Sequence, residues 1–387
     1  MDKCEDYELV CYNTDNSKIK GKVNQVFIPE NVADIKRIIA DSADVVPRGM
    51  GNNFFGGCVS SNSNVVDMKK MNKIDFDFNN NSVYAGAGIS VKELNEKLNS
   101  MGYEFPFFDN GTIGGMIAMN VQSLFSAYGN ISDWIYEIEF VNGKSEFLKI
   151  RKSDFGEVCG LEGITGIIIG AKLKIIPYKK RSASIFQSSD IEEIFLITKK
   201  LRNFESIIAV RFYSPLLSKL LGFNDKYNII IVFNNENGKI LGEKYNKLIN
   251  IIKKDYSTFK REGYSETDDP KFLFEKIKNF VLLLEKFKVP YLVDFIESIV
   301  YSYFNDKIKK DEAIKMAKKM SGVSGRLGIG IRRKNLVDDL QKKLVKRIKF
   351  RCDPFLKMNK GKYIDNSEME EYRNLVLKNN ETEVKND

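Results

Sequence analysis

The chain has 387 residues, of which 43% are hydrophobic and 29% charged, a balance typical of proteins with a large buried core. This length exceeds what one core usually holds, so we expect two or three packed units. The sequence contains no histidine, which removes the most frequent general base and the most frequent metal ligand. Five cysteines without a Cys-x-x-Cys pair argue against a disulfide framework or a structural zinc site.

Charge and targeting signals narrow the class of protein further. The N-terminus has no basic region followed by an apolar stretch, and no apolar run approaches the length of a membrane span. We therefore expect a cytoplasmic protein without a transmembrane segment. The net charge is +9. The lysines occur together with acidic residues along predicted helices, as in Lys309–Glu312, and this mixture is typical of solvated helix faces. We expect no nucleic-acid partner.

The first part of the chain alternates helices and strands around glycine-rich loops. Apolar spacing predicts a helix over 29–42 and a strand from Val45, followed by a loop at 47–57 that contains four glycines. Strands are predicted at 64–68 and 82–88. Ser90–Glu93 is a capping box for a helix that ends at Gly102, with Leu94, Leu98 and Met101 expected to face inward.

Two further glycine clusters follow in the same part of the chain. One is Asn110–Gly115, which leads into a short apolar segment, and the other is Gly160–Gly166, which leads into a predicted strand over 167–176. Between them, Asn142-Gly143 predicts the turn of a β-hairpin that joins strands at 138–141 and 144–148.

Beyond residue 178 the glycines become sparse and the pattern changes. Strands are predicted at 211–213 and 228–233, and helices at 239–254, 271–288 and 335–349. We therefore predict an α+β protein. Its expected parts are a first domain at 20–178, a second at 179–335, a C-terminal segment at 336–365 and a polar tail at 366–387.

The order of the three glycine clusters resembles the FAD-binding domain of the vanillyl-alcohol oxidase and p-cresol methylhydroxylase (PCMH-type) family. Arg48–Asn53 stands in place of the Arg-Gly-x-Gly-Thr-Ser-type loop that binds the pyrophosphate in that family. Thr112–Gly115 matches its Thr-Ile-Gly-Gly element, which lies along the flavin. Gly160–Ile168 matches its Gly-x-Glu-Gly-x-x-Gly-Ile-Ile element.

This resemblance implies a two-lobed FAD-binding domain followed by a smaller α+β cap domain that binds substrate. The residues carried over as FAD-binding are Pro47, Arg48, Gly49, Met50, Gly51, Asn52, Asn53, Gly57, Gly111, Thr112, Ile113, Gly114, Gly115, Ala118, Asn120, Gly163, Gly166, Ile167, Ile168 and Asn359. Asn52 stands where relatives often carry the histidine that bonds FAD, so FAD is expected to bind without a covalent bond.

The C-terminal end resembles the glycolate oxidase and D-lactate dehydrogenase branch of that family. Asp353-Pro354 and Asn359–Lys362 look like its Asp-Pro…Asn-Pro-Gly-Lys tail, with Lys360 in place of proline. In that branch the tail folds back onto the flavin lobe, and its Asn sits near the isoalloxazine.

Other family elements are missing. The stretch 325–333 lacks the histidines and the acid of the branch's His-x-Gly-Asp-Gly-Asn-x-His segment. The stretch 274–278 has only a weak similarity to the branch's Trp-x-x-Arg helix. No metal site is therefore expected.

The resulting interpretation is an FAD-dependent oxidoreductase that oxidises a small 2-hydroxy acid, similar to glycolate or D-lactate, by hydride transfer to the flavin. One alternative is a non-catalytic or electron-relaying FAD subunit of a glycolate-oxidase-like complex. Another is a sugar or lactone oxidase of the same fold. The chain is then expected to bind a small-molecule substrate. The sequence does not decide whether a partner subunit or a separate electron acceptor takes the electrons from the flavin.

A hydroxy-acid oxidase needs a cation for the carboxylate and a base for the hydroxyl. Arg326 is the first candidate cation, followed by Arg211 and Lys276, because arginine binds a carboxylate through two hydrogen bonds. Arg332 and Arg333 are further candidates for the cation that binds the carboxylate. The base stays open among Tyr213, Tyr301, Glu297 and Asp294.

Overall fold

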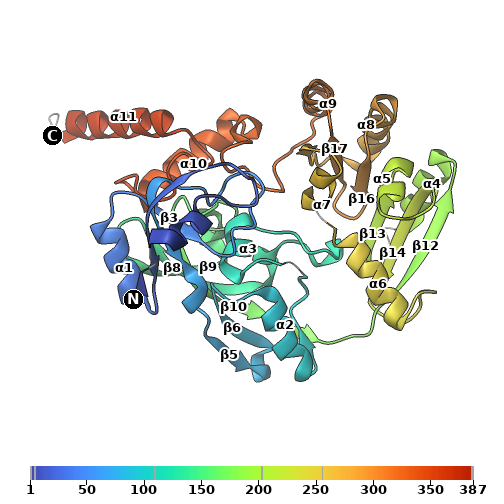
Figure 1. Cartoon of the computed structure of the whole chain (residues 1–387), viewed down its shortest axis with the longest axis horizontal. Coiled ribbons are helices and arrows are strands. Elements are labelled where there is room, and N and C mark those ends of the chain that lie inside the picture. Colours follow the sequence, from blue (N-terminus) through green and yellow to red (C-terminus); the bar gives the residue numbers. More distant parts are fainter. Residues whose placement is uncertain (1, 4–5, 109, 202–203, 255, 385–387) are drawn as a thin grey trace. The chain divides into compact units, whose positions relative to one another are not determined.

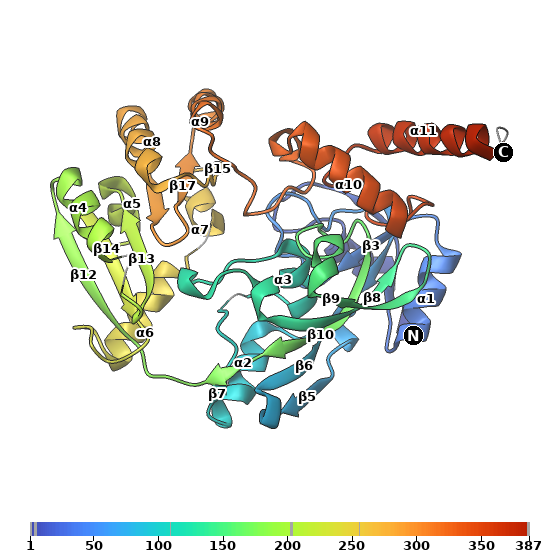
Figure 2. The same ribbon diagram turned by 180° about the vertical axis from the view of Figure 1, so that it is seen from behind.

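The computed structural model describes residues 2–3, 6–108, 110–201, 204–254 and 256–384. The chain divides into two compact units (Figures 1 and 2). Unit 1 comprises Met1–Val121, Asn130–Pro177 and Leu327–Asp387, and unit 2 comprises Gln122–Gly129 and Tyr178–Arg326. The expected α+β class is confirmed.

A small, mainly parallel sheet forms the first part of unit 1. Its strand order is β1-β2-β4-β3, with bounds Asp2–Lys3, Lys22–Ile28, Ser61–Asp67 and Val45–Arg48. Helix α1 (Val32–Asp41) buries Ile35, Ile38 and Ile39. It begins later than Pro29 because the side chain of Asn31 accepts a hydrogen bond from the Asp34 N–H and caps the helix there.

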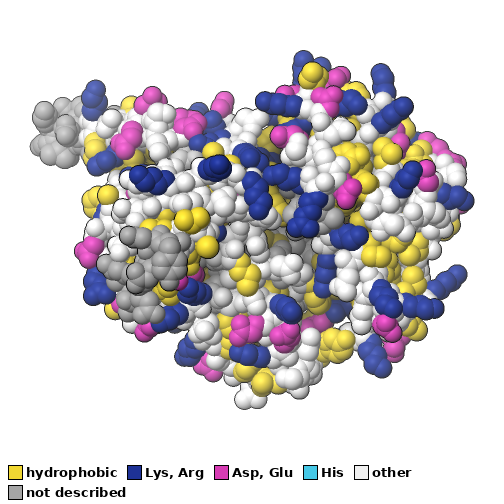
Figure 3. Space-filling view, viewed as in Figure 1, with side chains coloured by type: hydrophobic (Ala, Val, Ile, Leu, Met, Phe, Trp, Pro, Cys, Tyr) yellow, Lys and Arg dark blue, Asp and Glu magenta, His cyan; other side chains and the backbone are white. Residues whose placement is uncertain are grey.

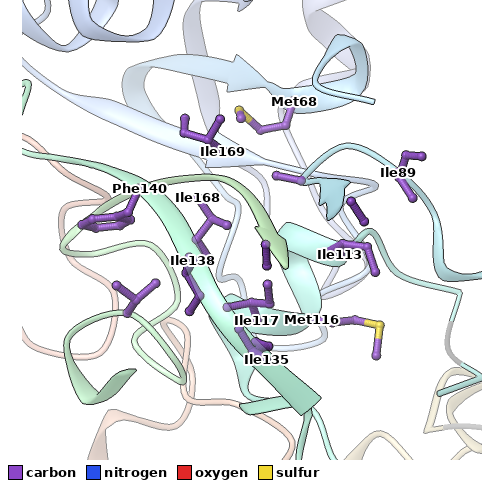
Figure 4. Close-up of a cluster of buried hydrophobic side chains, with 14 of the residues drawn as sticks. Met68, Ile89, Ile113, Met116, Ile117, Ile135, Ile138, Phe140, Ile168 and Ile169 are labelled. Atoms are coloured by element: carbon purple, nitrogen blue, oxygen red, sulfur yellow. The ribbon is translucent and has the colours of Figure 1, made fainter. Parts of the chain in front are cut away.

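A five-stranded antiparallel sheet forms the second part of unit 1. Its order is β5-β6-β10-β8-β9, with bounds Ile74–Asp77, Ser82–Gly86, Gly166–Lys174, Ile135–Asn142 and Phe147–Arg151. Helices α2 (Val91–Ser100) and α3 (Ile113–Met119) contribute to the same apolar core as this sheet. Ile117, Ile138 and Ile168 lie together in this core (Figure 4). A minor strand pair joins β7 (Tyr103–Glu104) to β11 (Ile176–Pro177).

Two local expectations in unit 1 are wrong. Met101 is 46% exposed, because α2 ends at Ser100 and Gly102 then turns the chain with φ of 79°. The hairpin turn is longer than two residues, and β9 begins at Phe147. The Asn142 side chain accepts hydrogen bonds from the N–H groups of Lys144 and Glu146, and this stabilises the wider turn.

The C-terminal part of unit 1 returns to the parallel sheet. After α10 (Asp339–Cys352) the chain forms a parallel bridge between Met358 and Val45 of β3. The Lys349 ammonium on α10 donates hydrogen bonds to the Ile164 carbonyl, the Asp353 carboxylate and the Met358 carbonyl. Helix α11 (Asn366–Val384) follows in the segment that the sequence described only as a polar tail.

Unit 2 is built on a six-stranded antiparallel sheet. Its order is β12-β14-β13-β16-β17-β15, with bounds Ser182–Ser188, Tyr227–Phe233, Ile207–Tyr213, Tyr291–Asp294, Ile299–Phe304 and Glu266–Asp268. One face packs against α4 (Ile191–Leu201), α8 (Phe274–Phe287) and α9 (Lys307–Lys319). The shorter or peripheral helices are α5 (Pro215–Leu220), α6 (Gly242–Ile252) and α7 (Tyr256–Arg261).

The two units differ from the sequence-based division at two segments. Residues 122–129 cluster with unit 2, because the side chains of Arg211 and Asp294 hydrogen-bond to this loop. Residues 327–335 cluster with unit 1, where the Glu162 carboxylate accepts two of their N–H groups. Both differences arise from side chains that are distant in sequence, which periodicity does not report.

No helix among the described residues is long and apolar enough to cross a membrane. Lys and Arg side chains are spread over the face shown in Figure 3, together with Asp and Glu side chains. Some charged side chains of the molecule form exposed pairs one helical turn apart, such as Lys97 with Glu93 and Lys247 with Glu243. Such pairs add little stability and belong to solvated helix faces.

Candidate functional site

The first glycine cluster follows β3 directly. Arg48 ends this strand and is 8% exposed, and its Nη2 donates a hydrogen bond to the Thr14 carbonyl at 2.9 Å. Its guanidinium carbon lies 5.4 Å from the centre of the Tyr12 ring. Nη1 is buried and has no hydrogen-bond partner among the described residues. Because buried guanidinium nitrogens normally donate hydrogen bonds, Nη1 is suited to an anionic oxygen.

The backbone after Arg48 offers a second set of donors. Within the described residues, the N–H groups of Met50, Gly51, Asn52 and Asn53 have no acceptor. The Asn53 side chain shapes the loop, because its Oδ1 accepts the N–H groups of Phe55 and Gly57, both at 2.8 Å. Successive N–H groups without protein acceptors in a turn are a common way to bind phosphate. The loop therefore fits a pyrophosphate.

The second glycine cluster contacts the first. Thr112 caps α3 and accepts a hydrogen bond from the Gly115 N–H at 3.2 Å. A Cβ atom on Gly49 would lie 2.3 Å from the Thr112 hydroxyl, so only glycine allows this approach. Asn120 ends α3 with φ of 48°, a left-handed conformation that asparagine tolerates.

The third cluster closes against the other two. A Cβ atom on Gly163, which has φ of 75°, would lie 2.6 Å from the Pro47 ring. The Glu162 N–H donates to the Ala118 carbonyl at 2.9 Å. Ile167 and Ile168, expected to contact FAD, have buried side chains in the core of unit 1. Only their backbone groups remain for a ligand.

Asn359 joins the C-terminal tail to these clusters. It is 1% exposed, and its Nδ2 donates hydrogen bonds to the carbonyls of Gly57 at 3.0 Å and Glu162 at 2.7 Å. Its Oδ1 is buried without a partner among the described residues. Asn359 therefore holds two glycine clusters together and keeps one acceptor for a ligand or a water molecule.

Sequence reasoning missed the role of Glu162. This residue is 6% exposed, and its carboxylate accepts the N–H groups of Ile329 at 2.6 Å and Gly330 at 2.9 Å. Burial raises the pKa of Glu162, while the two backbone hydrogen bonds and the charge of Arg333 oppose this shift. The Gly-x-Glu-Gly motif contained the signal, because an acid between two glycines needs a specific partner.

A polar stripe lies on the sheet of unit 2. We define it as Arg211 and Tyr213 of β13, Asp294 of β16, Tyr301 of β17 and Asn228 of β14. In the register of this sheet Arg211 pairs with Asp294, Tyr213 pairs with Leu292 and Asn228, and Leu292 pairs with Tyr301. Paired residues and alternate residues along a strand share a face. The stripe therefore lies opposite the face that α4, α8 and α9 cover.

The loop at 122–129 packs on this stripe. Arg211 Nη2 donates to the Leu124 carbonyl at 2.9 Å, and the Ser126 hydroxyl donates to the Asp294 carboxylate. The Arg181 guanidinium lies 5.0 Å from the Phe125 ring centre and 6.0 Å from that of Tyr128. Ser126–Tyr128 form a short 3-10 helix that contacts β13.

Several polar atoms of this loop and of the stripe are buried without a hydrogen-bond partner among the described residues. They are Nε of Arg211, the hydroxyl of Tyr213, and both Nε2 and Oε1 of Gln122. The Tyr213 hydroxyl is near enough to the Arg211 guanidinium for their charges to interact, although the two form no hydrogen bond of normal geometry. Burial raises the pKa of Tyr213 to about 12. Such a group of unpaired buried atoms is unusual away from a binding site.

The other two catalytic candidates lie elsewhere in unit 2. The Lys276 ammonium on α8 donates to the Met320 carbonyl at 2.9 Å, a contact within the helical layer. Arg326 is exposed at the end of unit 2. The structure thus brings Arg211 and Tyr213 together, whereas Lys276 lies in the helical layer on the other face of the sheet. Among the described residues no group of three or more Cys, Asp or Glu side chains could hold a metal ion.

Comparisons with known proteins agree with the first of these two sites. Residues 23–151 match the model of the family described as FAD binding domain. D-lactate dehydrogenase of Archaeoglobus fulgidus is 26% identical over 167 residues, which are 38% of this chain and 38% of that protein. D-arabinono-1,4-lactone oxidase of Candida glabrata is also 26% identical over 167 residues, covering 39% of this chain and 32% of that protein. The match therefore spans 38% of the first relative's length and 32% of the second's.

A solved structure matches a longer part of the fold. It is an alkyldihydroxyacetonephosphate synthase with a TM-score of 0.70 at 16% sequence identity. The alignment covers 92% of this chain and 81% of that one, and at this identity it shows the fold alone.

Unit 1 thus contains an FAD-binding domain, as the three glycine clusters and their phosphate-type loop indicate. Residues 23–151 are thus similar to this family of FAD-binding domains, and the fold of the chain agrees with the PCMH-type resemblance of its sequence. When bound, FAD supplies a two-electron acceptor for a hydride.

Proposed function

We propose that the chain is an FAD-dependent oxidoreductase that oxidises a small 2-hydroxy acid and holds the acid on the polar stripe of unit 2. The observations that carry this proposal are the unpaired buried Nε of Arg211 and hydroxyl of Tyr213 on the stripe, together with the unpaired buried amide of Gln122 at the start of the covering loop. The Arg211 Nε–H and the Gln122 amide N–H groups need acceptors, and the Gln122 Oε1 needs a donor. A hydroxy acid supplies both, because its carboxylate accepts hydrogen bonds and its hydroxyl donates one.

The connection between the two sites supports this proposal. The loop that covers the stripe begins at Gln122, only two residues after Asn120 ends α3 in the second glycine cluster. The similarity to a D-lactate dehydrogenase is consistent with an acid substrate, and the similarity to a lactone oxidase keeps sugar acids and lactones in the comparison.

Within this proposal Arg211 binds the carboxylate and Tyr213 orients the substrate. Arg211 already donates to Leu124 through Nη2, which fixes its guanidinium plane and leaves Nε for the ligand. Tyr213 remains protonated at neutral pH because burial raises its pKa, so it acts as a hydrogen-bond donor. Arg211 therefore takes the role that sequence analysis assigned first to Arg326.

Anaerobic reduction of the bound flavin tests the proposal. The purified FAD-loaded chain is mixed with D-lactate, glycolate, 2-hydroxyglutarate, a sugar acid and a lactone, and the loss of flavin absorbance is followed. We expect reduction by at least one 2-hydroxy acid and slower reduction by the lactone. Reduction by the lactone alone would favour a lactone oxidase. Loss of absorbance only after a second subunit is added would favour the electron-relaying alternative.

Arg211→Lys tests the carboxylate site. Lysine keeps the positive charge but not the Nε–H donor that the Leu124 contact holds in place, so the apparent Kd for the hydroxy acid should rise about tenfold to a hundredfold, equivalent to about 1.5 to 3 kcal/mol. Arg326→Ala is measured in parallel. If only Arg326→Ala weakens binding, the carboxylate binds at Arg326 and the stripe is not the substrate site.

A further inference from the structure

Oxidation of a hydroxy acid needs a catalytic base, and a chain without histidine must provide it from another side chain. The sequence left Tyr213, Tyr301, Glu297 and Asp294 as candidates. We infer that the Asp294 carboxylate takes the proton from the substrate hydroxyl and that Ser126 positions it for this step. This inference rests on the proposed oxidation of a hydroxy acid at the stripe.

Geometry favours Asp294 over the other three candidates. It is 1% exposed and lies directly across from Arg211 in the sheet register, so it is next to the proposed carboxylate site. The Glu297 carboxylate forms an ion pair with the Lys271 ammonium, with 2.6 Å between Oε2 and Nζ, and this pair makes it a weaker proton acceptor. Burial raises the pKa of Tyr213 to about 12 and that of Tyr301 further, so neither phenol is ionised at neutral pH.

The surroundings of Asp294 suit an acceptor that must bind a proton reversibly. Ser126 donates to its Oδ2, and the Glu297 N–H donates to its Oδ1 at 3.3 Å. The charged and titratable groups that face it are Arg211 and Tyr213 of β13, Tyr301 of β17 and Glu297 of the following turn. Burial raises the pKa of Asp294, while Arg211 and Ser126 lower it. A raised pKa makes a carboxylate a stronger base near neutral pH.

The proton and electron balance of the step is complete. The O–H bond of the substrate breaks, its proton moves to Asp294, and the bonding electron pair forms the carbonyl. FAD, when bound, would supply the two-electron oxidant, so that the hydrogen on the carbon would leave with its electron pair and the hydroxy acid would become a keto acid. The proton later leaves Asp294 to solvent.

The experiment compares flavin reduction by the FAD-loaded wild type and two variants between pH 5 and 9, with the best hydroxy acid from the substrate screen. Asp294→Asn should slow reduction about 10²-fold to 10⁴-fold, the usual effect of losing a general base. It should also abolish the rise of the rate with pH. Ser126→Ala removes a hydrogen bond that stabilises the carboxylate form, so the rise should move to higher pH.

Asp268→Asn is the matched control. Asp268 is 0% exposed and belongs to the same sheet, but its register with Ser302 and Tyr291 places it on the face that the helices cover. It should reduce flavin at close to the wild-type rate. FAD content and reduction by dithionite verify that each variant retains a working flavin.

The outcomes separate the base from the underlying function. If the wild type is reduced but Asp294→Asn stays within about threefold of it, the inference about the base is overturned and the proposed function stands. If no hydroxy acid reduces the wild type, both are overturned. If Asp294→Asn does not fold, Ser126→Ala decides: a shifted rise supports the inference, and an unchanged pH profile overturns it.

Discussion

Single residues decide whether the first glycine loop can bind the pyrophosphate, and Gly51 is the strictest position. Its φ of 71° is left-handed, and a Cβ atom there would lie 2.3 Å from Nη2 of Arg48. Side chains at Gly51 would thus strain the backbone and displace the guanidinium whose Nη1 is available to an anion. The arginine side chain is thus the group that a substitution at Gly51 would displace.

We expect Gly51→Val to weaken FAD binding at least about tenfold, equivalent to about 1.4 kcal/mol. The measurement is titration of the apoprotein with FAD, followed by quenching of flavin fluorescence, with circular dichroism as the test of folding. Gly156→Val is the control, because a Cβ atom there has no neighbour within 4 Å. Equal FAD affinity of Gly51→Val and the parent would show that the loop is not the pyrophosphate site.

At the scale of elements, sequence patterns predicted best where the signal is local. The Ser90 capping box and Gly102 correctly placed α2, and the apolar run at 228–233 predicted β14 close to its observed bounds. The glycine clusters indicated the FAD-binding elements for the same reason, since each cluster is a short motif. The polar stripe could not be predicted, because it depends on the register of four strands and on a loop from another part of the chain.

Glu162 links two elements that are distant in sequence, and its removal should be measurable. Glu162→Gln keeps the shape of the side chain but leaves it with one oxygen for the N–H groups of Ile329 and Gly330. We expect the free energy of unfolding to fall by about 1 to 3 kcal/mol in urea denaturation of the FAD-saturated protein. Glu96→Gln, at an exposed position of α2, should change it little.

The contribution of Glu162 to the free energy of unfolding should also depend on pH, in a direction that its pKa defines. Burial raises the pKa of Glu162 above its usual value of 4.5, so the folded protein holds this proton to higher pH than the unfolded chain. Stability from this group is therefore greatest below pH 4.5 and decreases as the pH rises through the raised pKa. The stability difference between wild type and Glu162→Gln should shrink across that window. A difference that grows with pH would mean that the hydrogen bonds outweigh the burial.

For the whole molecule, the firmest chemical expectation concerns how FAD is held. Attachment through histidine is excluded by composition, since the chain has none. Attachment through cysteine needs a thiolate, but burial raises the pKa of Cys58 and of Cys159 to about 12. Both thiols lie close to glycine clusters in sequence, and at neutral pH both are protonated. FAD should therefore be bound without a covalent bond.

The absence of imidazole also limits metal chemistry across the chain, because a transition-metal site would have to use thiolates and carboxylates alone. We expect acid or heat denaturation to release all the yellow colour into the supernatant, with the mass of FAD, and EDTA to leave flavin reduction by the substrate unchanged. Cys58→Ser should retain the same amount of releasable FAD. Flavin that stays on the precipitated chain would demonstrate a covalent bond, and inhibition by EDTA that added zinc reverses would demonstrate a metal requirement. Either result would require ligands or attachment sites that the histidine-free sequence and the protonated thiols of Cys58 and Cys159 do not supply.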